Sequence, residues 1–272
     1  MPLRAELSAS PFPQKTAWWK ACFEDAVRRQ QPQHIRARVD GMAELLALEP
    51  RSRILDLCCG VGQEAVELAR RGHRVLGVDV TEEGLREARQ SMRGTNLFCH
   101  FVKADMRNIP YSGEFDAVVA RHPSFGRFPK ERDDLRSLES VRKALKPGGR
   151  FLLKLVNRDW VLRHLPLAGS EGGVRFDFAS GRLEGQRAAG RDPHAPSSVR
   201  LYALTEVLRL LGAAGLAFKR VWGRFDASPY GLDSFHMIVL AERPRDALRA
   251  RDEDDDLPRA IRVKGRGRSQ QR

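Results

Sequence analysis

The sequence predicts an α/β fold, with a mostly parallel sheet of seven strands and helices on both faces. Short runs rich in β-branched residues alternate with longer segments that have a helical apolar period, a pattern typical of parallel sheets. A glycine-rich turn follows the first of these runs and opens directly into a helix. The chain has 272 residues, of which 42% are hydrophobic, so it is large enough to bury a sizeable core.

Two helices are expected ahead of the first strand. Apolar residues at three- and four-residue spacings predict helices over 15–29 and 34–48, and Pro50 ends the second one. We expect these helices to form an amino-terminal cap over residues 15–49.

Alternating strands and helices then occupy the middle of the chain. The periodicity predicts strands over 53–57, 74–78, 98–102, 115–120 and 151–156, with helices over 63–71, 82–92 and 133–145 between them. Later in the chain it predicts a helix over 204–214 and strands over 218–224 and 236–241. These segments supply the seven strands of the sheet.

Two segments depart from this alternation. After Asn157, glycine-rich turns predict a small antiparallel insertion at about 158–200, following the fifth strand. Residues 244–272 carry blocks of charge without an apolar period and predict a disordered tail. We therefore expect one domain over residues 1–243, followed by the tail.

Composition and charge limit the class of protein. The 48 basic and 35 acidic residues give a net charge of +13, which fits either a nucleic-acid-binding surface or an arginine-rich solvated one. No window approaches the ~20 apolar residues of a membrane span, and residues 1–14 lack the apolar run of a secretory signal. The four cysteines are too few and too irregular for a disulfide scaffold or a CxxC zinc site. We expect a cytoplasmic protein with no metal site and no membrane partner.

Acidic residues lie at the ends of three successive predicted strands. Asp56 precedes the turn that contains Gly60 and Gly62, which leads into a helix whose first N–H groups are free. Asp79 ends the second strand, 23 residues later, where a carboxylate can accept both ribose hydroxyls of a nucleoside. Asp105 follows the third strand and can accept an amino hydrogen from adenine. Each acid alone fits a solvated loop, but the three together favour a nucleoside site.

Two nucleoside cofactors fit this arrangement. The run Gly60-x-Gly62-x-x-Ala65 satisfies a permissive form of the dinucleotide-binding pattern, in which a pyrophosphate lies on the helix end. Asp56 at the head of the turn would repel a pyrophosphate but could bind an amino-acid ammonium group. This residue favours S-adenosylmethionine over a dinucleotide.

Three segments carry a family resemblance. Over about residues 35–157 the chain resembles the class I S-adenosylmethionine-dependent methyltransferases. The segments that carry the resemblance occur in the family's order: ILDLCCGVGQEAVELARRGHRVLGVDVTEEGLREAR, VKADMRNIPYSGEFDAVV and ALKPGGRFLLKLVNRDW. Later segments resemble a bacterial small-molecule-type subgroup. The resemblance implies a Rossmann-like methyltransferase fold, and S-adenosylhomocysteine as the product of the cofactor. Cys58 stands where the family usually has a glycine.

The resemblance also implies which residues bind the cofactor. The residues carried over, together with the neighbouring Arg121, are Asp56, Cys58, Gly60, Gly62, Asp79, Val80, Asp105, Met106 and Arg121. The loop after the first strand would hold the methionine part, the second strand the ribose, and the third strand the adenine.

The segment after the fourth strand is where such enzymes meet the methyl acceptor. Here it reads ARHPSFGRF over 120–128, matching relatives at the serine, at both phenylalanines and at the glycine only. His122 is the best-placed base, since its charge changes near neutral pH; it could also merely pack beside the cofactor. We expect the acceptor to meet a set of polar and cationic side chains: Arg127, Arg158, Tyr202, Asp226 and Tyr230.

These observations favour a methyltransferase that acts on an O or N nucleophile of a small molecule. The sequence lacks the Asn/Asp-Pro-Pro-Tyr run of enzymes that methylate base amino groups, and it lacks the paired catalytic cysteines of 5-methylcytosine enzymes. The basic surface and tail keep open an RNA- or ribosome-directed methyltransferase. The altered 120–127 segment keeps open a non-catalytic S-adenosylmethionine-binding protein.

Overall fold

The computed structural model describes residues 31–121, 124–165, 174–185 and 198–245. The helix expected over 15–29, the candidate base His122 and nearly all of the expected tail lie outside these residues.

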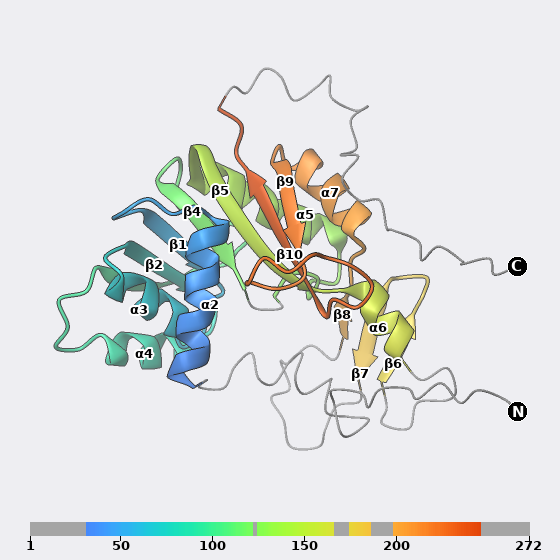
Figure 1. Ribbon diagram of the computed structural model, residues 1–272, viewed down its shortest axis with the longest axis horizontal. Coiled ribbons are helices and arrows are strands. Elements are labelled where there is room, and N and C mark those ends of the chain that lie inside the picture. Colours follow the sequence, from blue (N-terminus) through green and yellow to red (C-terminus); the bar gives the residue numbers. More distant parts are fainter. Residues whose placement is uncertain (1–30, 122–123, 166–173, 186–197, 246–272) are drawn as a thin grey trace, which may run out of the picture.

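A seven-stranded sheet forms the centre of the fold, as the sequence predicts (Figure 1). Its strands are β1 (Arg53–Leu57), β2 (Arg74–Asp79), β3 (Cys99–Lys103), β4 (Phe115–Ala120), β5 (Leu145–Val156), β9 (Ala217–Trp222) and β10 (His236–Glu242). The strand order is β3-β2-β1-β4-β5-β10-β9. Strands β1 to β5 are parallel, and β10 is antiparallel to both β5 and β9. The carboxyl ends of the parallel strands therefore meet at one edge.

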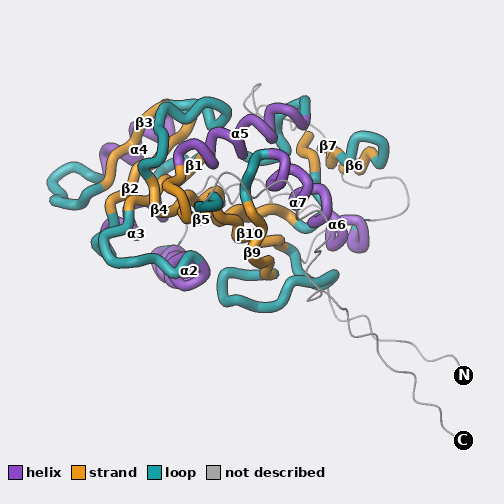
Figure 2. Tube along the Cα trace, turned by 90° about the horizontal axis from the view of Figure 1, so that it is seen from above, coloured by secondary structure: helices purple, strands orange, loops and turns teal. Residues whose placement is uncertain are grey.

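Helices cover both faces of this sheet. They are α2 (Pro32–Leu45), α3 (Gln63–Arg70), α4 (Glu82–Ser91), α5 (Glu131–Ala144) and α7 (Leu204–Ala213). Because side chains alternate along a strand, Ile54 packs in the apolar cluster with α2, α3 and α4, and Leu55 in the cluster with α5 and α7. Figure 2 shows α2 and α5 on opposite sides of the sheet. Among the described helices, none is long and apolar enough to cross a membrane.

The antiparallel insertion is present as a separate small sheet. Its strands are β6 (Val174–Asp177), β7 (Arg182–Gly185) and β8 (Ser198–Arg200), in the order β6-β7-β8. The short helix α6 (Arg158–His164) lies beside them (Figure 1). Its buried Trp160 belongs to the same apolar cluster as Phe176 and Leu183. This helix was not predicted from the sequence, because seven residues are too few to show an apolar period.

Two elements differ from their predicted bounds for local reasons. Helix α2 begins at Pro32, whose fixed φ suits a first helical position, and it ends at Leu45, before the expected residue 48. Strand β5 begins at Leu145 and not at residue 151, since Gly148 and Gly149 exchange backbone hydrogen bonds with Arg243 just after β10. Pairing with the end of β10 thus extends the strand through a turn-like sequence.

Candidate functional site

The turn after β1 contains three residues with left-handed backbone conformation. Cys58, Gly60 and Gly62 have φ angles of 58°, 56° and 73°. A Cβ atom on Gly62 would lie 2.5 Å from the ring of Phe101, so the position requires glycine. A Cβ on Gly60 would meet nothing within 4 Å. The backbone at Gly60 is therefore open to a ligand, next to the first N–H groups of α3.

One carboxylate joins this turn to the end of β2. Asp79 accepts hydrogen bonds from the Gly60 N–H at 2.9 Å, from the Thr81 N–H at 2.8 Å and from the Thr81 hydroxyl at 2.7 Å. An ionised carboxylate has about four acceptor positions, so about one is left for a ligand hydroxyl. Asp79 thus holds the turn in place and can still accept a hydrogen bond from a ligand hydroxyl.

A cavity of about 300 Å³ opens beside the turn, at the carboxyl ends of β1, β2 and β3. Apolar side chains form most of its wall: Leu57, Val78, Val80, Ala104, Met106 and Phe128. The other lining residues are Cys58, Asp105, Arg107, Ser124 and Arg127. A pocket with a mostly apolar lining and a few polar groups is the usual form of a small-molecule or cofactor site.

The two residues expected to bind adenine, Asp105 and Met106, differ in solvent exposure. Met106 is buried, whereas Asp105 is exposed enough to reach solvent. The Arg107 guanidinium lies 2.6 Å from the Asp105 carboxylate, and its hydrogen bond holds the pKa of that carboxyl below its usual range. Val80 is 56% exposed although it is apolar, so its side chain offers an open flat surface at the cavity margin.

Acidic groups predominate at the buried end of the turn. Asp56 is 3% exposed, and burial raises its pKa to about 8, with further contributions from Glu64 and Asp79 against the opposing effect of Arg121. Arg121 and Arg38 both contact Glu64, at 2.9 Å and 2.7 Å. This end of the site favours a cationic ligand group, because a nearby positive charge would stabilise the Asp56 carboxylate.

Cys58 has a backbone conformation that usually requires glycine. Its φ of 58° is a conformation that costs a non-glycine residue about 1–2 kcal/mol. The thiol faces Met106, with the two sulfur atoms 3.7 Å apart, and burial raises its pKa to about 12. The thiol is therefore neutral near pH 7, and its place in the site is that of a lining group.

Of the residues expected to meet the acceptor, Arg127 lines the cavity. Arg158 pairs with Glu206 at 2.7 Å. Asp226 is exposed in the loop after β9 and accepts a hydrogen bond from the Ser228 N–H. Neither Arg158 nor Asp226 is among the residues that line the cavity.

The two tyrosines expected in the same set point into the protein. Tyr202 is 1% exposed, and its hydroxyl donates to Asp134 at 2.7 Å. Tyr230 is half-buried and donates to the Asn157 side chain at 3.1 Å. The described structure thus does not bring the two tyrosines, which were expected to meet the acceptor, to the lining of the cavity.

Three residues of the site were not singled out in the sequence. Glu64 lies in the first turn of α3, where an acid is common simply because it suits the helix dipole. Its partner Arg38 is on α2, 26 residues earlier, and no local pattern relates the two. Thr81 did carry a signal, because a residue two positions after an aspartate often closes a turn on that carboxylate.

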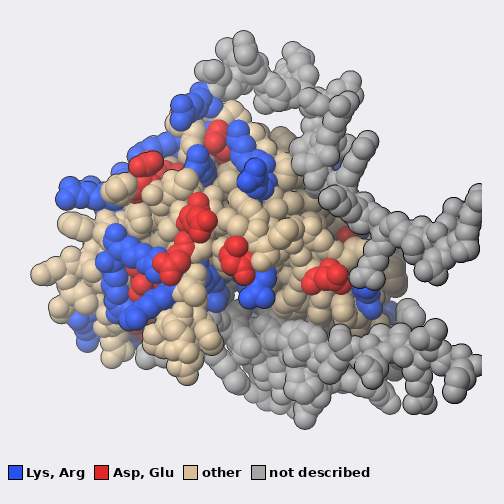
Figure 3. All heavy atoms as spheres, in the orientation of Figure 1, with Lys and Arg blue, Asp and Glu red and all other residues tan. Residues whose placement is uncertain are grey.

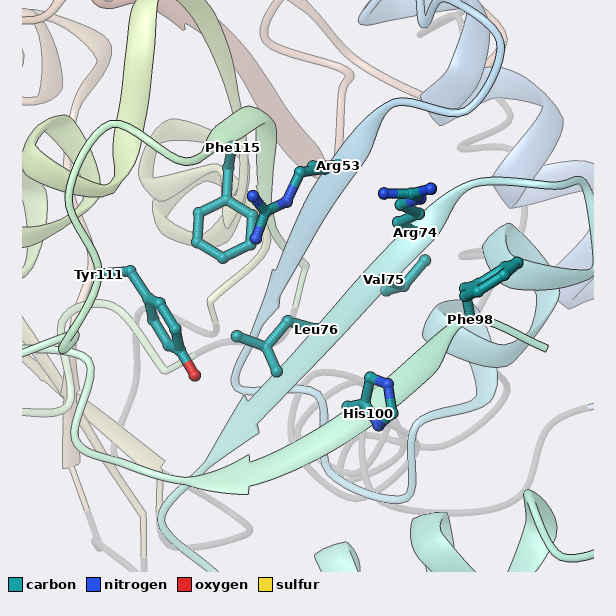
Figure 4. A pocket seen from close by; sticks show the side chains of 8 residues that line it. All are labelled: Arg53, Arg74, Val75, Leu76, Phe98, His100, Tyr111 and Phe115. Carbon is teal, nitrogen blue, oxygen red and sulfur yellow. The ribbon is translucent and has the colours of Figure 1, made fainter. Parts of the chain in front are cut away.

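A second hollow, of about 450 Å³, lies at the opposite edge of the sheet (Figure 4). Arg53, Arg74 and Phe115 line it at the amino ends of their strands, together with Tyr111 from the loop before β4. It is remote from the glycine-rich turn and from every acid considered above. Among the described residues, no group of three or more His, Cys, Asp or Glu side chains could hold a metal ion.

Comparisons with known proteins relate this chain to methyltransferases. Residues 54–149 match a family model described as a methyltransferase domain. Demethylmenaquinone methyltransferase of Deinococcus radiodurans is 37% identical over 114 residues, which are 41% of this chain and 45% of that protein. Ubiquinone biosynthesis O-methyltransferase of Xanthomonas campestris is 26% identical over 206 residues, 74% of this chain and 80% of that protein. The chain spans about half the length of the first curated relatives that it matches.

Solved structures agree on the fold. An S-adenosylmethionine-dependent methyltransferase from Clostridium acetobutylicum superposes with a TM-score of 0.64 at 16% identity, covering 84% of this chain and 97% of that one. The superposition extends the likeness well beyond residues 54–149. Residues 54–149 are therefore similar to a methyltransferase domain, and the described sheet has the fold of a solved S-adenosylmethionine-dependent methyltransferase.

Proposed function

We propose that the chain is an enzyme that transfers the methyl group of S-adenosylmethionine to an O or N nucleophile of a small molecule. The observation that carries this proposal is the occurrence, at one edge of the sheet, of a mostly apolar cavity and of the buried acid Asp56, which lies at the end of β1 and does not itself line the cavity. A neutral adenine ring suits the walls, and a cationic amino-acid group suits the acids. A pyrophosphate of a dinucleotide would favour the neutral form of Asp56, whereas an ammonium group would favour the carboxylate and gain a charge-assisted contact with it.

Each part of the cofactor has a matching group on this chain. Asp79 has about one acceptor position left for a ribose hydroxyl. Asp105 and the backbone at Met106 suit the adenine edge, with Val80 against the ring. Asp56 suits the ammonium. Because Cys58 keeps the glycine-like φ, its backbone leaves room for the same approach.

S-adenosylmethionine supplies an activated sulfonium methyl group, so the protein mainly has to align the acceptor and exclude water. Alignment of this kind can contribute about 7–11 kcal/mol to lowering the barrier. Arg127 and Phe128 close the cavity from the side of β4, where the acceptor would enter. His122 remains our candidate for the base that removes the acceptor's proton.

Two observations support a small-molecule acceptor over RNA. The names of the two relatives above refer to quinone compounds, which are small molecules. On the face in Figure 3, the basic side chains of the described residues lie interspersed with acidic ones. A phosphate backbone is bound best by a continuous basic surface.

The test is formation of S-adenosylhomocysteine, measured by mass spectrometry, with a panel of small hydroxyl and amine compounds and with total RNA. Turnover with a small molecule supports the proposal. Turnover only with RNA, with affinity that falls steeply with salt, favours the RNA-directed alternative. Cofactor binding without turnover on either panel favours the non-catalytic alternative.

A further inference from the structure

The loop between β4 and α5 supplies one wall of the cavity, and an unusual set of contacts fixes its shape. Ser124, Arg127 and Phe128 line the cavity from this loop. Gly126 lies between them, with a φ of 86°. The position of the loop relative to β1 and β3 therefore decides how wide the cavity is.

A buried carboxylate holds the centre of this loop. Asp134, on the first turn of α5, is 1% exposed and accepts the Gly126 N–H at 2.8 Å. Its other oxygen accepts the Tyr202 hydroxyl at 2.7 Å. The Tyr202 ring packs against Phe125 of the loop, with centroids 5.3 Å apart. Two donors from segments 8 and 68 residues away in the chain thus meet on one side chain.

The antiparallel insertion holds the same loop from the other side. The Arg200 N–H of β8 donates to the Gly126 carbonyl at 2.8 Å, and the Arg182 guanidinium of β7 donates to the Phe128 carbonyl at 3.1 Å. A Cβ on Gly126 would lie 2.3 Å from the Arg200 carbonyl oxygen. The insertion is therefore in direct contact with the backbone of Gly126 and Phe128, which restrains this part of the loop.

Burying a carboxylate is a poor way to gain stability, since burial disfavours its charged form. Burial indeed raises the pKa of Asp134, against the effects of the Gly126 and Tyr202 hydrogen bonds. The arrangement instead favours one conformation around Gly126, because the Asp134 carboxylate accepts both hydrogen bonds only when both donors are in place.

We propose that Asp134 and Tyr202 are positioning residues that hold the Ser124–Phe128 loop against the cavity and so determine the affinity for the adenosyl ligand. Neither side chain lines the cavity. They act on the ligand through Gly126 and its neighbours. The identity of the ligand rests on the function proposed above; the positioning role rests on the contacts just described.

Calorimetry of the full chain with S-adenosylhomocysteine tests this role in four variants. Asp134→Ala leaves the Gly126 N–H and the Tyr202 hydroxyl without their buried partner, and we expect at least about tenfold weaker binding. Asp134→Asn has the same shape: its oxygen can accept from Gly126 and its amide can donate to the Tyr202 oxygen. We expect this variant to restore binding to within about threefold of wild type. Tyr202→Phe removes one hydrogen bond, and we expect an intermediate loss.

Val239→Ala is the matched control, because Val239 is fully buried in β10 and lies outside the loop and the insertion. We expect it to lower the melting temperature without changing the affinity. Equal weakening by Val239→Ala would overturn the positioning role and show a general effect of lost stability. Unchanged binding by folded Asp134→Ala or, where that variant does not fold, by Tyr202→Phe would overturn it as well. Failure of the folded wild-type chain to bind overturns the proposed function instead.

Discussion

Asp56 gives the most specific prediction, because its pKa of about 8 means that the free protein carries it largely protonated near pH 7. A bound ammonium group would favour the carboxylate and expel the proton. If the bound carboxylate stays ionised, the affinity of the wild-type chain for the ligand falls about 50-fold between pH 8 and pH 6. The reason is that the ionised fraction of Asp56 in the free protein drops about tenfold per pH unit below the pKa. Asp56→Asn has the same shape without the titration, and we expect its affinity to change only with the ligand's own amino group.

The assay is calorimetry with S-adenosylhomocysteine at pH 6, 7 and 8, in two buffers of different ionisation enthalpy, with Asp56→Asn as control. We expect wild type to release a proton on binding at pH 7 and the variant to release less. A ratio of wild-type to variant affinity that does not change with pH would refute the assignment of Asp56 to the ammonium.

The raised pKa of Asp56 also predicts how the stability of the ligand-free protein depends on pH. The pKa of Asp56 is higher in the folded than in the unfolded chain. Its contribution to the free energy of unfolding is therefore fully present below about pH 4 and is lost as the pH rises to about 8. The loss is about 1.4 kcal/mol per pH unit in that window, which lowers the melting temperature by about 3–6 °C per unit relative to Asp56→Asn. Parallel melting curves of the two proteins against pH would contradict a buried, protonated Asp56.

Three further substitutions test the turn itself. Asp79→Ala removes the acceptor for three hydrogen bonds, and we expect S-adenosylhomocysteine binding to fall at least about 100-fold; calorimetry showing normal affinity would refute its role. Gly62→Ala places a methyl 2.5 Å from the Phe101 ring at a positive φ, so we expect a loss of about 2–4 kcal/mol in unfolding free energy, which chemical denaturation would measure; an unchanged midpoint would contradict the packing. Cys58→Gly relieves the left-handed strain of a non-glycine residue, and we expect binding within about threefold of wild type; a large loss would assign the thiol a contact of its own.

Much of the fold could be predicted because its signals are local. The bounds of β1 and β4 agree with the sequence to the residue, since β-branched runs of that length read clearly between polar ends. The turn at Gly60 and Gly62 was recognisable because only glycine adopts such conformations freely. The meeting of three acids at one edge follows from parallel strands alone.

What could not be predicted depends on contacts between distant segments. No pattern in the sequence around Arg121 indicates that this residue forms a buried ion pair with Glu64, 57 residues earlier in the chain. Tyr202 was expected to meet the acceptor, but its side chain is buried and its hydroxyl donates to Asp134 of α5, 68 residues away in the chain. Strand β5 gained its first residues from pairing near the end of β10, which lies about a hundred residues later.

The central claim is that the cavity beside Gly60 binds an adenosyl amino acid. Isothermal titration calorimetry of the full chain with S-adenosylmethionine, S-adenosylhomocysteine and NAD tests it most directly. The account predicts saturable binding of both adenosyl ligands and no heat from NAD. Binding of NAD alone, or no binding of either adenosyl ligand by folded protein, would contradict it.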